Sequence, residues 1–172
     1  SELRNDPTLA LGTSEVSLLE LTGAYSVLSN GGTSVTPHAI RRVRMSSGRV
    51  IFARDGGSQV QLVDPMIAGE LSSMLNTAMM SGTGRRAAIA GHPAAGKTGT
   101  SQEFRDAWFI GYTAHLTGGV WIGNDNGKPM NRAVGGGLPA EIWREVMAAA
   151  HAGKAPLALP GTTFAPLAVP DA

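Results

Sequence analysis

One stretch of eleven residues, GHPAAGKTGTS at positions 91–101, allows two incompatible folds around a single lysine, Lys97. Counted from Gly91, it fits G-x-x-x-x-G-K-[ST], the loop in which nucleotide-binding proteins hold phosphate, and a helix must then begin after the lysine. Counted from Lys97, it gives Lys-Thr-Gly-Thr, a pattern that requires a strand at the edge of a pocket. The flanking residues must decide whether Lys97 is followed by a helix or lies in a strand.

The flanking sequence does not suit a phosphate loop. Residues 84–90, GRRAAIA, contain arginines and alanines and make a poor buried strand. Gly99 would oppose a helix by about 1 kcal/mol relative to alanine, and an aromatic segment follows soon after it. Asp125, which could be considered for magnesium, lies in a turn rich in Gly and Asn. We therefore keep nucleotide binding only as a remote alternative.

The strand interpretation gives each residue of this segment a chemical role. Lys97 would supply positive charge for a substrate carboxylate, and Thr98 and Thr100 would offer hydroxyl donors. Gly99 lacks a side chain and would let an extended peptide lie against the backbone. A backbone N–H beyond the glycine can face a developing oxyanion, and losing one such donor typically costs about 3 kcal/mol of barrier lowering. Taken alone, however, Lys-Thr-Gly is better explained by a surface lysine at a turn.

The pattern along the rest of the chain predicts an α+β fold. Segments rich in aromatic and β-branched residues predict three consecutive antiparallel strands, near Ala94–Ser101, Asp106–Thr113 and Leu116–Asn124. A β-hairpin is expected around Ser46-Ser47-Gly48, from Val35–Met45 and Val50–Arg54. Apolar residues at helical spacing predict three helices packed against the sheet, at Leu18–Ser29, Pro65–Met80 and Pro139–Ala152.

Two of these helices have recognisable start signals. Ser17 and Glu20 match the capping box of the first helix. Asp64 is the expected N-cap of the second helix, with Pro65 in its first position. The buried stripe of the second helix is expected to comprise Ile67, Leu71, Met74, Leu75, Ala78 and Met79. The tryptophans are also expected in the core, namely Trp108, Trp121 and Trp143.

Composition excludes several classes of site. A net charge of +1 is too small for a broad nucleic-acid surface, so no nucleic acid is expected as a partner. The cluster Arg41, Arg42 and Arg44 is interpreted as the solvated face of a strand, with a phosphate patch as the alternative. The chain has no cysteine, which excludes thiol catalysis and Cys-ligated zinc. Its four histidines lack metal-ligand spacing, and we expect no metal and no cofactor.

Several short stretches, in a fixed order and spacing between Leu11 and Ala152, carry a resemblance to a known family. They are Leu11–Val16 with Leu19-Glu20, Tyr25–Gly32, Thr36-Pro37, Gly82–Gly84, Gly96–Ser101, Arg105–Thr113, Val120–Asp125, and Gly135–Ala140 with Ile142-Trp143. Together they resemble the C-terminal half of the transpeptidase domain of class A penicillin-binding proteins. The resemblance implies a partial penicillin-binding or β-lactamase-like fold whose sheet has further strands.

The resemblance also implies acyl transfer in two steps. In the family, a serine attacks the D-Ala-D-Ala bond of a peptidoglycan stem peptide, and the acyl group passes to an amine of a neighbouring stem. β-Lactams mimic D-Ala-D-Ala and trap the acyl-enzyme. By resemblance, the catalytic groups here are Lys97 and the Thr100 backbone N–H, which forms half of the oxyanion hole. The substrate-binding strand would comprise Thr98, Gly99, Thr100 and Ser101.

The chain departs from the family because two motifs are absent. No serine has a lysine three residues on (Ser-x-x-Lys), and none has an asparagine two residues on (Ser-x-Asn). Its lysines are Lys97, Lys128 and Lys154. We therefore expect no nucleophile in this chain, interpret it as an excised piece, and predict that it is inactive alone.

The expected partners follow from the resemblance. They are stem peptides ending in D-Ala-D-Ala, β-lactams and the N-terminal half of the same domain, with self-association as another way to cover an exposed sheet edge. The parent protein is expected at the extracytoplasmic face of the cytoplasmic membrane. Residues 1–152 are interpreted as the transpeptidase portion and residues 153–172 as a Pro-rich, extended or disordered tail. The alternative function is a non-catalytic module that binds stem peptide or a protein.

Overall fold

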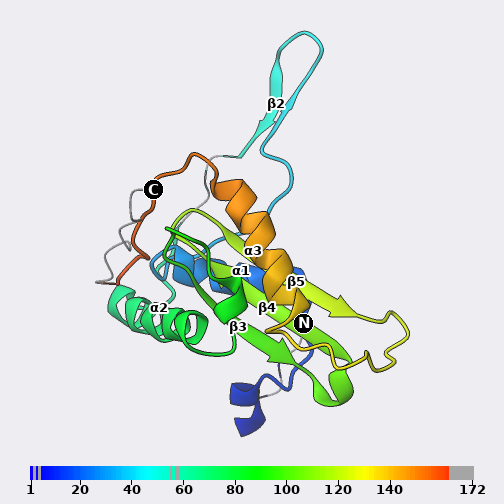
Figure 1. Cartoon of the computed structure of the whole chain (residues 1–172). Helices are drawn as coiled ribbons and strands as arrows, with labels where there is room; N and C mark the ends of the chain where they lie inside the picture. The colour runs from blue at the N-terminus through cyan, green and yellow to red at the C-terminus, as the bar shows by residue number, and fades with distance from the viewer. Residues whose placement is uncertain (2, 4, 55, 57–58, 163–172) are drawn as a thin grey trace.

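The computed structural model describes residues 1, 3, 5–54, 56 and 59–162 (Figure 1). Helices and strands follow one another in the order α1 (Leu18–Ser29), β1 (Arg42–Arg44), β2 (Val50–Ala53), α2 (Pro65–Met80), β3 (Ala95–Thr100), β4 (Asp106–Tyr112), β5 (Thr117–Gly123) and α3 (Leu138–His151). Short 3-10 helices lie at Pro7–Leu11, Arg85–Ala87 and Gln102–Phe104. A sheet of β3, β4 and β5 is flanked by helices, so the predicted α+β class is confirmed.

The central sheet is antiparallel, with β4 between β3 and β5. Lys97 lies opposite Ile110 across β3 and β4, and Trp108 lies opposite Trp121 across β4 and β5. Each of the three strands begins and ends within one residue of its predicted bounds. Within the described residues, the outer edges of β3 and β5 pair with no further strand.

Helix α3 covers one face of the sheet (Figure 1). Trp143 is 1% exposed and packs edge-on against Phe109, with ring centroids 5.2 Å apart. Its indole N–H donates to the carbonyl oxygen of Gly118 at 3.0 Å, which satisfies the one polar group of a buried tryptophan. This residue therefore joins α3 to both β4 and β5.

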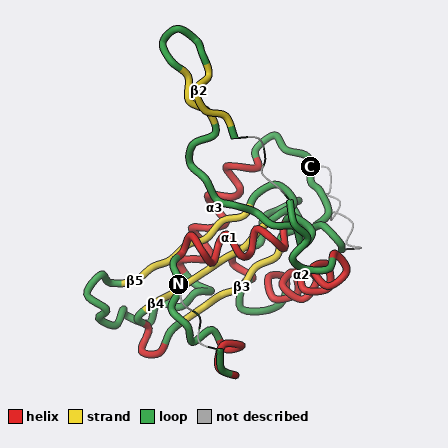
Figure 2. Tube along the Cα trace, turned by 180° about the vertical axis from the view of Figure 1, so that it is seen from behind, coloured by secondary structure: helices red, strands yellow, loops and turns green. Residues whose placement is uncertain are grey.

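Helix α1 covers the opposite face, and α2 lies beside β3, as Figure 2 shows from behind. Tyr112 of β4 is buried between them: its ring lies 6.5 Å from that of Tyr25 on α1, centroid to centroid. Its hydroxyl lies 2.7 Å from the hydroxyl of Ser72 on α2. Burial raises the pKa of Tyr112, so the phenol stays neutral and can share this hydrogen bond.

The predicted start signals of α1 and α2 are confirmed. The Ser17 hydroxyl accepts from the Glu20 N–H at 3.2 Å, and the Glu20 carboxylate accepts from the Ser17 N–H at 2.9 Å. A carboxylate oxygen of Asp64 accepts from the Met66 N–H at 2.8 Å. Each cap satisfies N–H groups that the first helical turn leaves without a partner.

The predicted buried stripe of α2 is wrong in part. Among the predicted members, Leu75 and Met79 are buried, whereas Ile67, Leu71 and Met74 are exposed. The helix instead buries small residues, Ala68, Gly69 and Ser72. A Cβ on Gly69 would lie 2.0 Å from the carbonyl oxygen of Gly161, so close approach of the chain selects glycine there. The spacing of apolar residues in α2 could not reveal this contact, because the segment that returns over the helix has no helical or strand periodicity.

The returning segment after α3 has no helix or strand in its described part, residues 153–162. Leu159 is nevertheless 1% exposed and packs in a cluster with Leu75, Ala95 and Tyr112. The first part of this segment therefore packs against the core. Residues 163–172 lie outside the described residues, and the domain boundary after residue 152 stays a prediction.

Three histidines meet where this segment leaves α3. The ring centroid of His92 lies 4.7 Å from that of His151 and 6.5 Å from that of His115. Nε2 of the buried His151 lies 2.8 Å from Thr113 Oγ1. Burial and the neighbouring imidazoles lower the pKa of His92. In the part of the chain that the structure describes, no group of three or more His, Cys, Asp or Glu residues is arranged to hold a metal ion.

The predicted hairpin is confirmed, but its strands are shorter than the sequence pattern suggested. β1 spans Arg42–Arg44 and β2 spans Val50–Ala53, and all of their residues are exposed. Figures 1 and 2 both show this hairpin standing away from the rest of the chain. No helix among the described residues is both long and apolar enough to cross a bilayer.

Candidate functional site

Lys97 lies in the middle of β3, so the phosphate-loop alternative is wrong. The strand continues to Thr100, and only a three-residue 3-10 helix, Gln102–Phe104, follows it before β4. A phosphate loop requires a helix that starts directly after the lysine and points its N–H groups at the ligand. Nucleotide binding therefore has no support in the local geometry.

The hydrogen bonding of β3 directs alternate peptide groups away from the sheet. The Ser101 N–H donates to the carbonyl oxygen of the first residue of β4 at 3.0 Å. Opposite residues of an antiparallel pair alternate between hydrogen-bonded and non-hydrogen-bonded positions. By this alternation Lys97 and Gly99 bond to β4, whereas the N–H and C=O groups of Thr98 and Thr100 point to the outer edge of β3.

The Lys97 ammonium lies at the same edge. Its Nζ donates to the Thr98 carbonyl oxygen at 2.9 Å, one of the outward-pointing groups. Nearer the start of the strand, the side-chain amide of Asn76 on α2 donates to the Ala94 carbonyl oxygen at 2.7 Å. Helix α2 therefore covers the first part of the edge, and a positive charge stands beside the part formed by Thr98 and Thr100.

Two loops hold the threonine hydroxyls of β3. Thr98 Oγ1 lies 2.8 Å from Thr83 Oγ1, and Thr100 Oγ1 accepts from the Gly135 N–H at 3.1 Å. A Cβ on Gly135 would lie 2.2 Å from the carbonyl oxygen of Trp108, so only glycine allows this approach. Segments far apart in the sequence thus fix the orientation of both hydroxyls.

Ser101, the last residue predicted to bind substrate, has its hydroxyl in the turn between β3 and β4. The hydroxyl donates to Asp106 Oδ2 at 2.9 Å and accepts from the Asp106 N–H at 2.8 Å. Asp106 therefore stabilises the turn between β3 and β4. Trp121 donates its indole N–H to Asp106 Oδ1 at 2.9 Å and is 37% exposed, so its predicted core position is wrong. A substrate contact from Ser101 stays a prediction.

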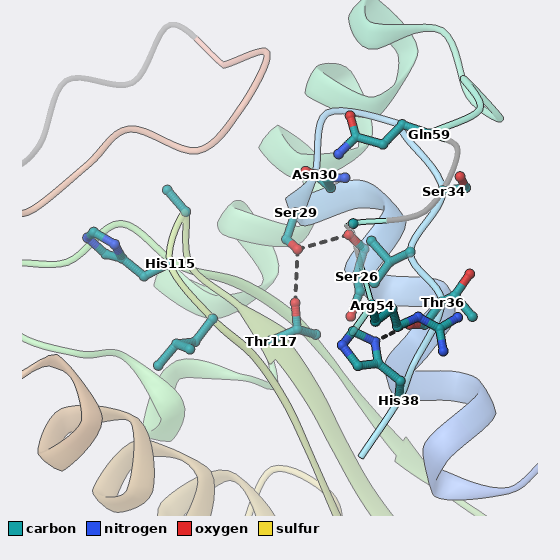
Figure 3. Close-up of a pocket in the computed structure, with 14 residues that line it drawn as sticks. Ser26, Ser29, Asn30, Ser34, Thr36, His38, Arg54, Gln59, His115 and Thr117 are labelled. Carbon is teal, nitrogen blue, oxygen red and sulfur yellow. Dashed lines mark hydrogen bonds between the residues drawn. The ribbon is translucent and has the colours of Figure 1, made fainter. Parts of the chain in front are cut away.

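A cavity of about 580 Å³ lies at the opposite end of the sheet (Figure 3). Its wall combines the end of α1, the base of the hairpin and the turn between β4 and β5. Ser29 Oγ of α1 and Thr117 Oγ1 of β5 lie 2.9 Å apart in this wall. The cavity is therefore separate from the Lys97 edge.

The family described as "Penicillin binding protein transpeptidase domain" matches residues 5–148 of this chain. The chain belongs to this transpeptidase family. The match includes β3 and both loops that hold its threonines, so the family assignment made from the sequence is confirmed.

Curated relatives of this transpeptidase chain agree with the assignment. Penicillin-binding protein 1A of Aquifex aeolicus is 37% identical over 141 residues, which are 81% of this chain and 19% of the relative. Penicillin-binding protein 1A of Neisseria gonorrhoeae is 36% identical over 160 residues, which are 90% of this chain and 20% of the relative. The chain thus spans about a fifth of the length of the curated relatives it matches.

Solved transpeptidase structures share the fold. The penicillin-binding protein PonA1 of Mycobacterium tuberculosis has a TM-score of 0.82 at 27% identity, over 97% of this chain and 47% of PonA1. The same protein in complex with penicillin V gives a TM-score of 0.80. Penicillin-binding protein 1A of Haemophilus influenzae gives 0.79 at 25% identity, over 89% of this chain and 29% of that chain.

Sequence reasoning missed three neighbours of the transpeptidase strand. Thr83 and Gly135 stood in stretches that carried the resemblance, but no role could be given to them from the sequence. Asn76 gave no signal, because a polar residue on a helix is usually solvated. A Cβ on Gly136 would lie 2.4 Å from the Thr83 carbonyl oxygen, which shows that the two loops are also in contact with each other.

Proposed function

We propose that β3 of this chain forms one wall of a D-Ala-D-Ala transpeptidase site that cross-links peptidoglycan through a serine acyl-enzyme. The observation that carries the proposal is the outer edge of β3, where the peptide groups of Thr98 and Thr100 point outward beside the Lys97 ammonium. An extended peptide can add to such an edge through main-chain hydrogen bonds.

The geometry suits the charges that develop in acyl transfer. A substrate carbonyl at the edge can accept from the Thr100 N–H, and this bond strengthens when attack by a serine converts the carbonyl into an oxyanion. Lys97 and the hydroxyls of Thr98 and Thr100 can receive the terminal carboxylate of the peptide. The C–N bond then breaks, the terminal D-Ala leaves with its amine protonated, and an amine of a second stem displaces the serine.

The serine must come from outside these residues, since none of the serines here belongs to Ser-x-x-Lys. The proposed partners are therefore a segment that carries this motif, the stem peptide and β-lactams. The complex of PonA1 with penicillin V supports the last of these. As for class A relatives, the proposed location is the extracytoplasmic face of the cytoplasmic membrane.

The absence of the serine motifs also supports a second candidate, a module that binds stem peptide or a protein without chemistry. The two candidates differ in one respect. When the serine segment is supplied, a transpeptidase wall supports acylation of that serine by penicillin, whereas a binding module does not.

The test is a chimera in which this chain replaces its matched segment in penicillin-binding protein 1A of Neisseria gonorrhoeae. We expect covalent labelling of the chimera by fluorescent penicillin and no mass increase of the 172-residue chain alone. A folded chimera, judged by a cooperative melting transition, that takes up no label would favour the binding module. A stoichiometric adduct on the isolated chain would contradict the assignment of the nucleophile.

A further inference from the structure

The projecting hairpin is the part of the molecule that the proposed site does not use. We define the arginine hairpin as residues 41–54, which include β1, β2 and their turn. Its apolar side chains lie in solvent: Ile51 is 58% exposed and Phe52 is 45% exposed. An isolated two-stranded hairpin is only marginally stable in water. Exposed apolar residues grouped on such an element make it a candidate contact surface.

The positive charge of the chain is concentrated in this hairpin. Residues 35–54 contain five arginines and no acidic residue, whereas the rest of the chain has nine basic and thirteen acidic residues. The arginines are Arg41, Arg42, Arg44, Arg49 and Arg54. None of them takes part in the ion pairs found among the described residues. Among the described residues, these five charges are therefore not neutralised by a carboxylate.

The register gives the hairpin two different faces. Val43 lies opposite Phe52, so these side chains share a face, and Met45, two residues after Val43, belongs to the same face. Arg42 and Arg44 alternate with them along β1 and lie on the other face, where the register shifts and Arg44 pairs with Val50. The hairpin thus has a mainly apolar face, at whose end the Arg49 guanidinium donates to Met45 Sδ at 3.1 Å, and a second face that carries Arg42 and Arg44.

The base of the hairpin leads into the cavity of Figure 3, and Arg54, His38 and His115 are among the residues that line it. No carboxylate occurs among the lining residues that the structure describes. Its volume of about 580 Å³ is in the range of pockets that hold small ligands. Hydroxyl and amide groups of residues such as Ser34 and Gln59 complete a wall suited to a polar, anionic ligand.

We propose that the arginine hairpin and the cavity at its base form a second contact for the peptidoglycan polymer, separate from the acyl-transfer edge. The proposal rests on the proposed function, which makes peptide stems with free carboxylates the substrate. Arginines pair with carboxylates in a bidentate manner, and the apolar face can pack against the C–H faces of sugar rings. The chemistry recognised is a carboxylate-bearing glycopeptide.

Other occupants fit the faces less well. A hairpin that laid its apolar face on a bilayer would direct Arg42 and Arg44 away from the lipid headgroups, because they lie on the opposite face. Two copies packed through Val43 and Phe52 would bring two sets of five arginines together. A polymer with acidic stems on a glycan strand can reach both faces.

The distance between the arginine hairpin and the edge of β3 would favour acyl transfer on polymeric peptidoglycan over transfer on a short free peptide. The cavity lies at the Tyr112 end of β4 and Thr100 pairs at the Ala107 end, a separation of about 17 Å for five residues of strand. One polymer held at two points of the same chain raises the effective concentration of its stems at the edge of β3.

The test is co-sedimentation of the 172-residue chain with purified insoluble peptidoglycan at low and high salt. The double variant Arg42→Gln with Arg44→Gln should weaken binding about tenfold, as expected for the loss of two exposed ion pairs. The matched control, Arg85→Gln with Arg132→Gln, removes the same charge from exposed positions elsewhere and should change binding less than twofold. Peptidoglycan with amidated carboxylates should bind weakly to the unmodified chain.

Several results would overturn the proposal. These are equal losses in the hairpin and control variants, unchanged binding after amidation, tighter binding to phosphatidylglycerol vesicles than to peptidoglycan, and self-association that Phe52→Ser abolishes. Penicillin labelling of the chimera reports the proposed function separately, because a β-lactam is too small to span both contacts. Hairpin variants should leave that labelling unchanged.

Discussion

Replacing Lys97 by alanine in the chimera should lower the second-order rate constant of penicillin acylation by about 10²- to 10³-fold, in the range measured for the loss of one electrostatic stabiliser of an acyl-transfer transition state. The Lys97 ammonium lies at the outer edge of β3, within hydrogen-bonding distance of the Thr98 carbonyl oxygen. Its removal leaves the substrate carboxylate with hydroxyl donors only.

The matched control for this experiment is Lys128→Ala. Lys128 is exposed in the loop that follows β5. Its replacement by alanine removes the same positive charge as Lys97→Ala. It should change the acylation rate by less than about twofold, because Lys128 follows β5, at the opposite edge of the sheet from β3, and solvent screens a charge over such a separation. Lys97→Arg should recover part of the rate, since arginine keeps the charge but not the compact geometry of the ammonium. Equal rates for Lys97→Ala and Lys128→Ala would remove Lys97 from the reaction.

Replacing Trp143 by alanine should lower the free energy of unfolding by about 3–5 kcal/mol, the usual cost of truncating a large buried aromatic residue. Trp143 is 1% exposed, packs against Phe109 and donates to the Gly118 carbonyl oxygen. The variant leaves a cavity between α3 and the sheet, and it also leaves that carbonyl without its donor.

Urea unfolding of the chain followed by circular dichroism measures this loss. Val146→Ala is the control on the same helix, because Val146 is 59% exposed and should cost less than about 1 kcal/mol. Similar decreases in the free energy of unfolding for the two variants would contradict the packing of Trp143 against β4.

The elements that could be predicted from the sequence are those with strong local signals. The capping pair Ser17 and Glu20 fixed the start of α1, and alternating aromatic segments located β4 and β5 to within a residue. The strand at Lys97 could be predicted because Gly99 opposes a helix at the one point where a phosphate loop needs it. These signals depend only on residues close in the sequence.

The remaining features depend on contacts between distant segments. The small residues of α2, such as Gly69, are buried because the chain returns over them at Gly161. The spacing of apolar residues in the sequence does not predict this contact. Trp121 is partly exposed because its indole N–H bonds Asp106 across the sheet. The role of Gly135 follows from its close approach to β3, a contact between segments far apart in the sequence.

The most direct test of the account is amide hydrogen exchange across β3, measured by NMR on the 172-residue chain. We expect slow exchange for the N–H groups of Lys97 and Gly99, which face β4, and exchange at least about 100-fold faster for Thr98 and Thr100, which face the outer edge. That result would leave the Thr100 N–H available to a substrate carbonyl. Continuous protection from Lys97 onward, or a Thr100 N–H as protected as that of Gly99, would contradict the proposed transpeptidase edge.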